Sequence, residues 1–151
     1  MHVRPGTPAD ADVVARQFLA LWPDGTLDEH RAEAEGILSG TPPSTLPLVV
    51  FVAEQDAKVV GFIEVGLRSH ADGCDGRRPV GFVEGWYVDP EHRGNGVGGA
   101  LMRAAEDWAR SQGCREMGSD TWLDHEVSQR AHEALGFEVV DRCVHYRKAL
   151  R

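Results

Sequence analysis

The sequence predicts one α/β (α+β) domain, and three observations lead to this fold class. The chain has 151 residues, 42% of them hydrophobic and 26% charged, which is the composition of a folded chain with room for a single core. Segments rich in β-branched residues alternate with segments whose apolar residues recur every three or four positions. No internal repeat, low-complexity tract or linker interrupts the sequence. We therefore expect one domain over residues 1–151, with helices flanking a mixed sheet.

The expected sheet has about six to seven strands. The clearest pair is a hairpin, 48–53 and 59–65, whose turn contains Gln55-Asp56-Ala57-Lys58. A further strand ends at Asp89-Pro90, because proline cannot donate to the next rung of a ladder. The full set of expected strands is 3–5, 48–53, 59–65, 80–88, 116–119, 137–140 and 143–148.

Four helices are expected, over 11–22, 27–38, 97–112 and 126–135. The first follows Thr7-Pro8-Ala9-Asp10, which supplies a cap and a proline for the first turn. The third carries an apolar stripe and ends before Gly113. The second is strongly acidic, and a solvated helix face is the simplest interpretation of its charge run.

Charge and composition exclude several classes of protein. The net charge of −8 argues against a general binder of nucleic-acid backbones or anionic membranes, and it is compatible with a cationic ligand. No apolar run is long enough to span a bilayer, and no signal-type stretch follows the N-terminus, so we expect a cytosolic protein. The three cysteines are expected to be reduced thiols. The histidines show no ligand spacing, so no metal is expected.

The segment Arg93-Gly94-Asn95-Gly96-Val97-Gly98-Gly99 lies between a predicted strand and the third predicted helix. Its glycines remove side chains where a backbone approaches a ligand, and the free amides of the helix N-terminus favour an anion. A diphosphate could therefore bind here despite the negative net charge. The alternative interpretation is a flexible connector. The segment lacks the Lys-Ser/Thr ending of a P-loop and the Gly-x-Gly-x-x-Gly spacing of dinucleotide-binding folds.

Arg93, Gly96 and Gly98 fit the signature Arg/Gln-x-x-Gly-x-Gly/Ala, so the sequence resembles the GNAT superfamily of acetyl-CoA-dependent N-acetyltransferases. Blocks along nearly the whole chain resemble one group within it, the aminoglycoside 6′-N-acetyltransferases. These blocks are Leu21-Trp22-Pro23, Phe82-Val83-Glu84-Gly85, 114–121, 132–137 and Tyr146-Arg147-Lys148.

The resemblance implies acetyl-CoA as cosubstrate, bound where the sheet splays. The residues implied to contact it are Trp86, Tyr87 and Val88 for the pantetheine arm, Arg93, Gly94, Asn95, Gly96, Val97, Gly98 and Gly99 for the diphosphate, and His125. The residues implied to contact the aminoglycoside are Trp22, His70, Glu84 and Asp120, with Asp141 reaching in from the partner subunit of a homodimer. Three positions depart from the family pattern. His125 replaces a more usual Asn, His70 replaces a Tyr of the group, and Gly25 replaces a His of some members.

The chemistry implied is direct attack by a neutral amine on the thioester in a ternary complex. A carboxylate with a pKa of about 4 and an ammonium with a pKa of about 10 differ by roughly 8 kcal/mol in proton affinity, so desolvation or a water relay must assist the transfer. We expect Asp120 to accept the proton and Glu84 chiefly to orient the substrate. His132 stands where many members have a tyrosine general acid, and packing is the alternative role for it. A backbone amide near Val88 would polarise the thioester carbonyl.

Three functions stay open at this point. The first is an aminoglycoside 6′-N-acetyltransferase that confers antibiotic resistance. The second is a GNAT enzyme acting on another cationic amine, such as a polyamine or a protein N-terminus. The third is a non-catalytic acetyl-CoA sensor, against which the carboxylates Asp120 and Glu84 argue.

Overall fold

The computed structural model describes residues 1–151 and contains one five-stranded sheet of order β1-β2-β3-β4-β5. The strands are β1 (His2–Pro5), β2 (Leu48–Gln55), β3 (Lys58–Arg68), β4 (Val80–Val88) and β5 (Met117–Ser119). The first three pairings are antiparallel, and β5 pairs with β4 in parallel. The sheet is therefore mixed, as the sequence predicts.

The chain divides into two compact units, Met1–Ser119 and Asp120–Arg151. The first unit holds the whole sheet and the helices α1 (Ala11–Leu21), α2 (Leu27–Leu38) and α3 (Val97–Ser111), with the short 3-10 turns η1 (Pro8–Asp10) and η2 (Pro90–His92). The second unit holds α4 (Glu126–Ala134) and the C-terminal tail. All four predicted helices are thus confirmed, with bounds within one or two residues of those expected.

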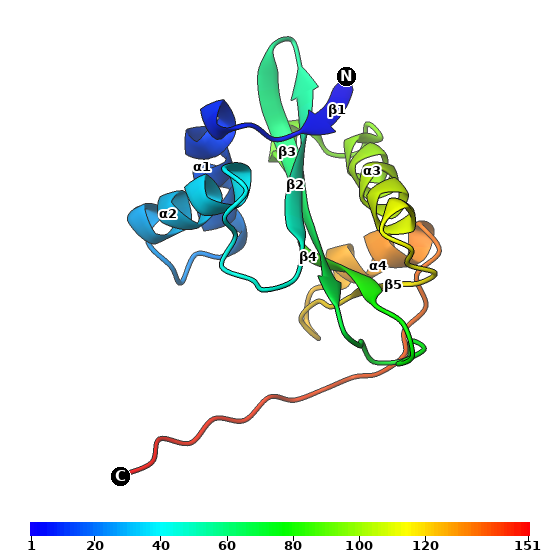
Figure 1. Ribbon diagram of the computed structural model, residues 1–151. Coiled ribbons are helices and arrows are strands. Elements are labelled where there is room, and N and C mark those ends of the chain that lie inside the picture. Colours follow the sequence, from blue (N-terminus) through cyan, green and yellow to red (C-terminus); the bar gives the residue numbers. More distant parts are fainter. The chain divides into compact units, whose positions relative to one another are not determined.

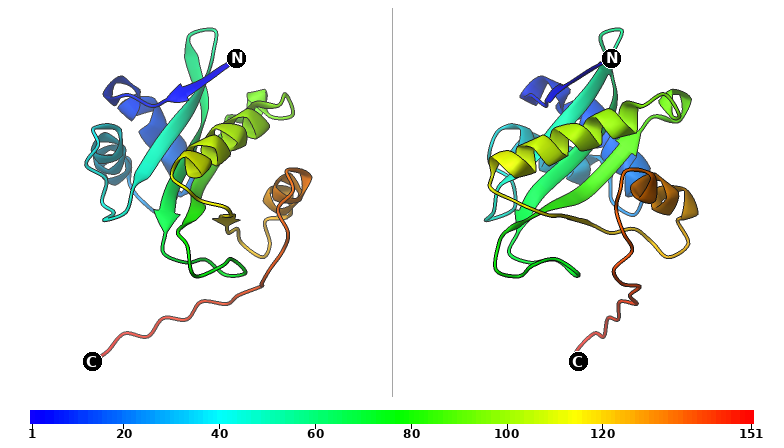
Figure 2. Two further views of the ribbon diagram at one scale, coloured as in Figure 1. Left: turned by 45° about the vertical axis from the view of Figure 1, so that its right-hand side comes forward. Right: turned by 90° about the vertical axis from the view of Figure 1, so that its right-hand side faces the viewer.

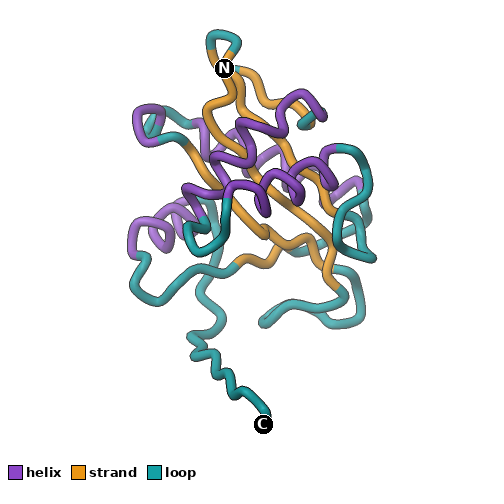
Figure 3. The backbone as a smooth tube through the Cα atoms, turned by 90° about the vertical axis from the view of Figure 1, so that its left-hand side faces the viewer, coloured by secondary structure: helices purple, strands orange, loops and turns teal.

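In the first unit, α1 and α2 cover one face of the sheet and α3 covers the other (Figures 1 and 2). Figure 3 views the unit from the side of α1 and α2. The α1/α2 face is closed by a cluster of buried apolar side chains: Val14, Ala15, Phe18, Ala34, Ile37, Val50, Val52 and Phe62. On the opposite side, the predicted apolar stripe of α3 is buried through Leu101, Met102, Ala105 and Ala109. Burying these side chains provides the main driving force that holds the helices on the sheet.

Two local features fix the ends of the helices near the sheet. Arg4 of β1 forms ion pairs with Asp10, at the start of α1, and with Glu54 of β2, each at 2.8 Å. The side chain of Thr26 accepts a hydrogen bond from the Glu29 amide and so caps α2. None of the helices combines the length and the hydropathy needed to cross a lipid bilayer.

The two C-terminal strands predicted over 137–140 and 143–148 are wrong, and the sheet has five strands rather than six to seven. Residues 137–151 contain neither helix nor strand, and Figure 1 shows the tail running out from α4 as an extended segment. Beyond Phe137, its large apolar side chains are exposed, with Tyr146 92% accessible. The β-branched residues are typical of a strand, but a strand forms only where the edge of another strand pairs with it.

Candidate functional site

The glycine-rich segment forms an open loop at the N-terminus of α3. Gly94 and Gly96 have φ values of +77° and +81°, a left-handed conformation that favours glycine. Gly96 is the residue that precedes the helix, and a Cβ atom at either glycine would meet no protein atom within 4 Å. The amides of the first turn of α3 therefore adjoin open space, where the helix dipole favours an anion. This geometry fits a diphosphate, as the sequence predicts.

Two side chains tie this loop to the end of β4. The Nε of Arg93 donates a hydrogen bond of 2.8 Å to the Val88 carbonyl, and the guanidinium carbon lies 5.6 Å from the centre of the Tyr87 ring. The Nε1 of Trp86 donates to the Gly98 carbonyl at 3.2 Å. Arg93 and Trp86 thus hold the loop against the strand in this structure.

The sheet opens beside the same loop. Pairing between β4 and β5 comprises Gly81–Met117, Phe82–Gly118 and Val83–Ser119, and it stops there. Because β4 continues to Val88, its last five residues have no β5 partner. Apart from the Val88 carbonyl, which Arg93 binds, the backbone groups that point away from β3 are available to pair with a ligand that runs like a peptide strand. The predicted splay is present at this edge.

A β-bulge re-aims Glu84 of β4. Glu64 pairs with Gly85 and Val65 pairs with Val83, so Glu84 is the extra residue. Arg68 of β3 binds both oxygens of Glu84, with Nε–Oε1 at 2.9 Å and Nη2–Oε2 at 2.8 Å. Glu84, expected to contact the substrate, is therefore a charge-compensated carboxylate in this structure.

Trp22 forms a wall over Gly85, the residue that follows Glu84. It follows the last residue of α1, and a Cβ atom added to Gly85 would lie 2.5 Å from its ring, so the indole lies directly over that glycine. Its ring centre is 5.2 Å from that of Phe18, and the ring stacks on His30 of α2. Trp22 is partly exposed and partly packed on the core. It can therefore support the fold and also present one edge to a ligand.

Four predicted site residues belong to the second unit: Asp120, His125, His132 and Asp141. Asp120 is its first residue and directly follows β5. His125 precedes α4, and its amide donates to the Trp122 carbonyl at 3.0 Å. Asp141 lies in the exposed tail. In the first unit, the predicted substrate residue His70 is exposed, two residues beyond β3.

The ring of His132 on α4 has a defined orientation. Its Nδ1 lies 2.7 Å from the Ser128 carbonyl, and its ring packs edge-on against Phe137 at 5.3 Å. Since a carbonyl only accepts, Nδ1 carries the proton of the neutral ring. His132 must therefore be fully protonated before its Nε2 can donate a proton.

Comparisons with known proteins agree with this arrangement, in which the glycine loop lies beside the splayed end of β4 and Glu84 lies on the same strand. The family model described as "Acetyltransferase (GNAT) family" matches residues 11–137. The chain belongs to this acetyltransferase family. It is 42% identical over 148 residues to an aminoglycoside N(6')-acetyltransferase type 1 of Klebsiella aerogenes, covering 98% of this chain and 96% of that protein. A protein of the same name from Stenotrophomonas maltophilia is 41% identical, and the match covers 98% of this chain and 93% of that protein.

Solved structures of an aminoglycoside N-acetyltransferase are similar to this one over nearly their whole length. AAC(6')-Iy in complex with the bisubstrate analogue CoA-S-monomethyl-acetylneamine has a TM-score of 0.87 and 35% identity, covering 99% of this chain and 98% of that one. The same enzyme in complex with CoA has a TM-score of 0.88, again at 35% identity, covering 99% and 95%.

One buried carboxyl group of this acetyltransferase was not predicted. Glu64 of β3 is only 4% exposed, and its Oε2 has no hydrogen-bond partner. Burial, with smaller contributions from Glu33 and Glu84, raises the pKa of Glu64 to about 8. The available signal was a single acidic residue within the apolar run Phe62-Ile63-Glu64-Val65.

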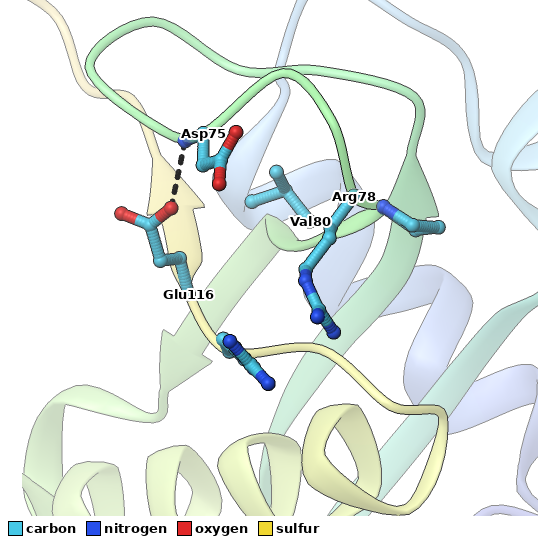
Figure 4. A pocket seen from close by; sticks show the side chains of 6 residues that line it. Asp75, Arg78, Val80 and Glu116 are labelled. Atoms are coloured by element: carbon cyan, nitrogen blue, oxygen red, sulfur yellow. Dashed lines mark hydrogen bonds between the residues drawn. The ribbon is translucent and has the colours of Figure 1, made fainter.

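A hollow lies elsewhere in the acetyltransferase, beside the start of β4 (Figure 4). It has a volume of about 210 Å³ and is lined by Asp75, Arg78, Pro79, Val80, Arg115 and Glu116. The Asp75 amide donates to Glu116 at 2.7 Å and so joins the two sides. None of the predicted site residues lines it. No group of three or more His, Cys, Asp or Glu side chains is arranged to hold a metal ion.

Proposed function

We propose that this GNAT enzyme is an aminoglycoside 6′-N-acetyltransferase, which transfers an acetyl group from acetyl-CoA to the 6′-amine of aminoglycoside antibiotics and so confers resistance to them. The observation that carries the proposal is the match to two proteins of that name at 41–42% identity over 98% of the chain. The open glycine loop beside the splayed strand supports the cosubstrate. The net charge of −8 suits a polycationic acceptor.

The glycine loop and the free edge of β4 would together hold acetyl-CoA. The amides from Gly94 to Gly99 would bind the diphosphate, and residues 86–88 would pair with the pantetheine arm. When bound, acetyl-CoA supplies the acetyl group as a thioester. The amide near Val88 would orient the carbonyl and stabilise negative charge on its oxygen.

Glu84 and Asp120 would have different roles toward the amine of the substrate. The attacking nitrogen must lose a proton, and we assign Asp120 as its acceptor. Glu84 would orient the substrate, and the substrate's ammonium groups would compete with Arg68 for its two oxygens. His132 could protonate the departing thiolate only from its doubly protonated form, since its Nδ1 proton is directed at the Ser128 carbonyl.

The whole chain, residues 1–151, would act as one domain and as a homodimer. The family match spans both compact units, from residue 11 to residue 137. The tail is extended and exposes Val139, Val140, Val144 and Tyr146, a pattern that suits pairing with a second copy. Asp141 would then reach the partner's substrate. A chain ending at Gly136 should sediment as a monomer, and a dimer of unchanged stability would contradict this assignment.

The cytosolic location stays a prediction, to be tested by cell fractionation.

A coupled thiol-release assay tests the proposed function. With acetyl-CoA, kanamycin should release coenzyme A, and fragmentation of the product in a mass spectrometer should place the acetyl group on the 6′-nitrogen. Turnover with spermidine alone would instead support acetylation of another amine. Coenzyme binding without thiol release from any amine would favour the sensor.

A further inference from the structure

Glu64 lies on the face of the sheet that α1 and α2 cover. Directly opposed residues of neighbouring strands point to the same face, and Glu64 is opposed by Val50 of β2 and Gly85 of β4. Val50 belongs to the buried cluster under α1 and α2, and Trp22 lies over Gly85. The Glu64 side chain therefore leaves the sheet next to the strand position that the Trp22 ring covers.

The titratable and charged groups on the elements around Glu64 include Glu33, Glu84, Arg68 and His30. Glu33 of α2 and Glu84 of β4 both act on it electrostatically, and both disfavour its ionised form. Arg68, on β3 itself, directs two donors at Glu84. His30 of α2 is buried against Trp22 and contacts the Trp22 carbonyl at 2.9 Å. The β2 neighbour, Val50, is apolar.

A carboxyl group in this position lacks a counter-charge. Glu64 is only 4% exposed, and its Oε2 is without a hydrogen bond. An unpaired buried carboxylate is costly, so the group holds a proton at neutral pH. A cation bound close to Glu33 and Glu84 would oppose their effect on Glu64 and, within a few ångströms of it, would favour its ionised form.

We propose that Glu64 is a positioning residue for the cationic substrate: when a polyamine-like ligand lies against Glu33 and Glu84, Glu64 releases its proton to solvent, and the resulting carboxylate helps to hold an ammonium group beside Trp22. The inference rests on the proposed function, and it names a residue that the family resemblance does not assign. The pKa of about 8 agrees with it, since the group is then mostly protonated at pH 7 before the ligand binds.

Proton release on binding is the direct readout. Kanamycin is titrated calorimetrically into the protein saturated with coenzyme A, at pH 7, in phosphate and in Tris, whose ionisation enthalpies differ. A group with a pKa near 8 is about nine-tenths protonated at pH 7, so Glu64→Gln should release up to about 0.9 fewer protons than the wild type. Glu35→Gln, an exposed change of the same charge on α2, should release as many protons as the wild type. Proton exchange by the ligand's own amines cancels in these differences.

A difference of at least about half a proton between the wild type and Glu64→Gln supports the inference, and a smaller one overturns it. If Glu64→Gln does not fold, carboxyl ¹³C spectra of the wild type replace it. One glutamate should titrate near pH 8, and kanamycin should lower its midpoint by a unit or more. No such resonance, or an unmoved midpoint, refutes the role.

Different experimental results would overturn the proposed function and the role of Glu64. Thiol release from kanamycin without a Glu64-dependent proton count overturns only the role of Glu64. Proton-linked binding of kanamycin or spermidine without acetyl transfer to kanamycin overturns only the proposed function. Absence of binding by both amines overturns both.

Discussion

Replacing Gly96 by alanine tests the glycine loop most cleanly, because the protein supplies a matched control at the other end of the same helix. Gly96 precedes α3 with φ +81°, and Gly113 follows it with φ +85°. A Cβ atom at either position would meet no protein atom within 4 Å. The two substitutions therefore carry the same backbone cost, about 1–2 kcal/mol for a left-handed residue other than glycine. For a chain of this size that cost lowers Tm by roughly 2–8 °C.

The two variants should differ in their affinity for coenzyme A. At position 96 the new methyl group occupies the space next to the amides that would bind the diphosphate. Losing one hydrogen bond to a charged group costs about 1.5–3 kcal/mol, so Kd should rise roughly 10- to 150-fold for Gly96→Ala. Gly113→Ala should bind as the wild type does. Calorimetric titration with coenzyme A measures both values, and equal affinities of the two variants would refute the assignment of the loop.

Three further predictions concern the carboxylates. Asp120→Asn should lower kcat by roughly 10²- to 10⁴-fold in the thiol-release assay while leaving the Kd for coenzyme A within about twofold; undiminished turnover would remove Asp120 from the reaction. Arg68→Gln removes the cation that binds Glu84 at 2.8 Å and competes with the substrate's ammonium groups. The KM for kanamycin should therefore fall about fivefold, which corresponds to roughly 1 kcal/mol. A raised KM would mean instead that Arg68 must hold Glu84 in place. Glu64 should make stability depend on pH: its pKa rises from 4.5 unfolded to about 8 folded, so between these values the folded state holds the extra proton and stability falls as pH rises. Urea unfolding at pH 5, 6.5 and 8 measures the free energy of unfolding of both proteins. Relative to the wild type, the free energy of unfolding of Glu64→Gln should rise by up to about 1.4 kcal/mol per pH unit. The same pH dependence for both proteins would contradict the raised pKa.

The local sequence was sufficient to predict the helices and the glycine loop. Their signals are contained in short windows: the apolar stripe of α3, the proline after β4, and glycines at positions that require positive φ. The positions of Gly94 and Gly96 follow from such local chemistry. The family signature falls on the same segment, so fold and cosubstrate were predicted together.

The parts that were missed depend on partners distant in sequence. The tail from Phe137 has the residue types of strands, but no strand of the chain pairs with it. The β-bulge at Glu84 and its ion pair with an arginine sixteen residues earlier were not predicted, because both depend on the pairing of β3 with β4. Glu64 appeared to be one polar residue in a strand, and only the packing of α1 and α2 makes it a buried acid. Register and burial are properties of the folded chain, so no local window reveals them.

The most direct test of the central claim is a crystal structure of the protein in complex with coenzyme A. The account predicts that the diphosphate oxygens lie within roughly 2.7–3.2 Å of backbone nitrogens between Gly94 and Gly99, with the pantetheine arm along residues 86–88 of β4. A diphosphate bound anywhere else, with the N-terminus of α3 facing only solvent, would contradict it.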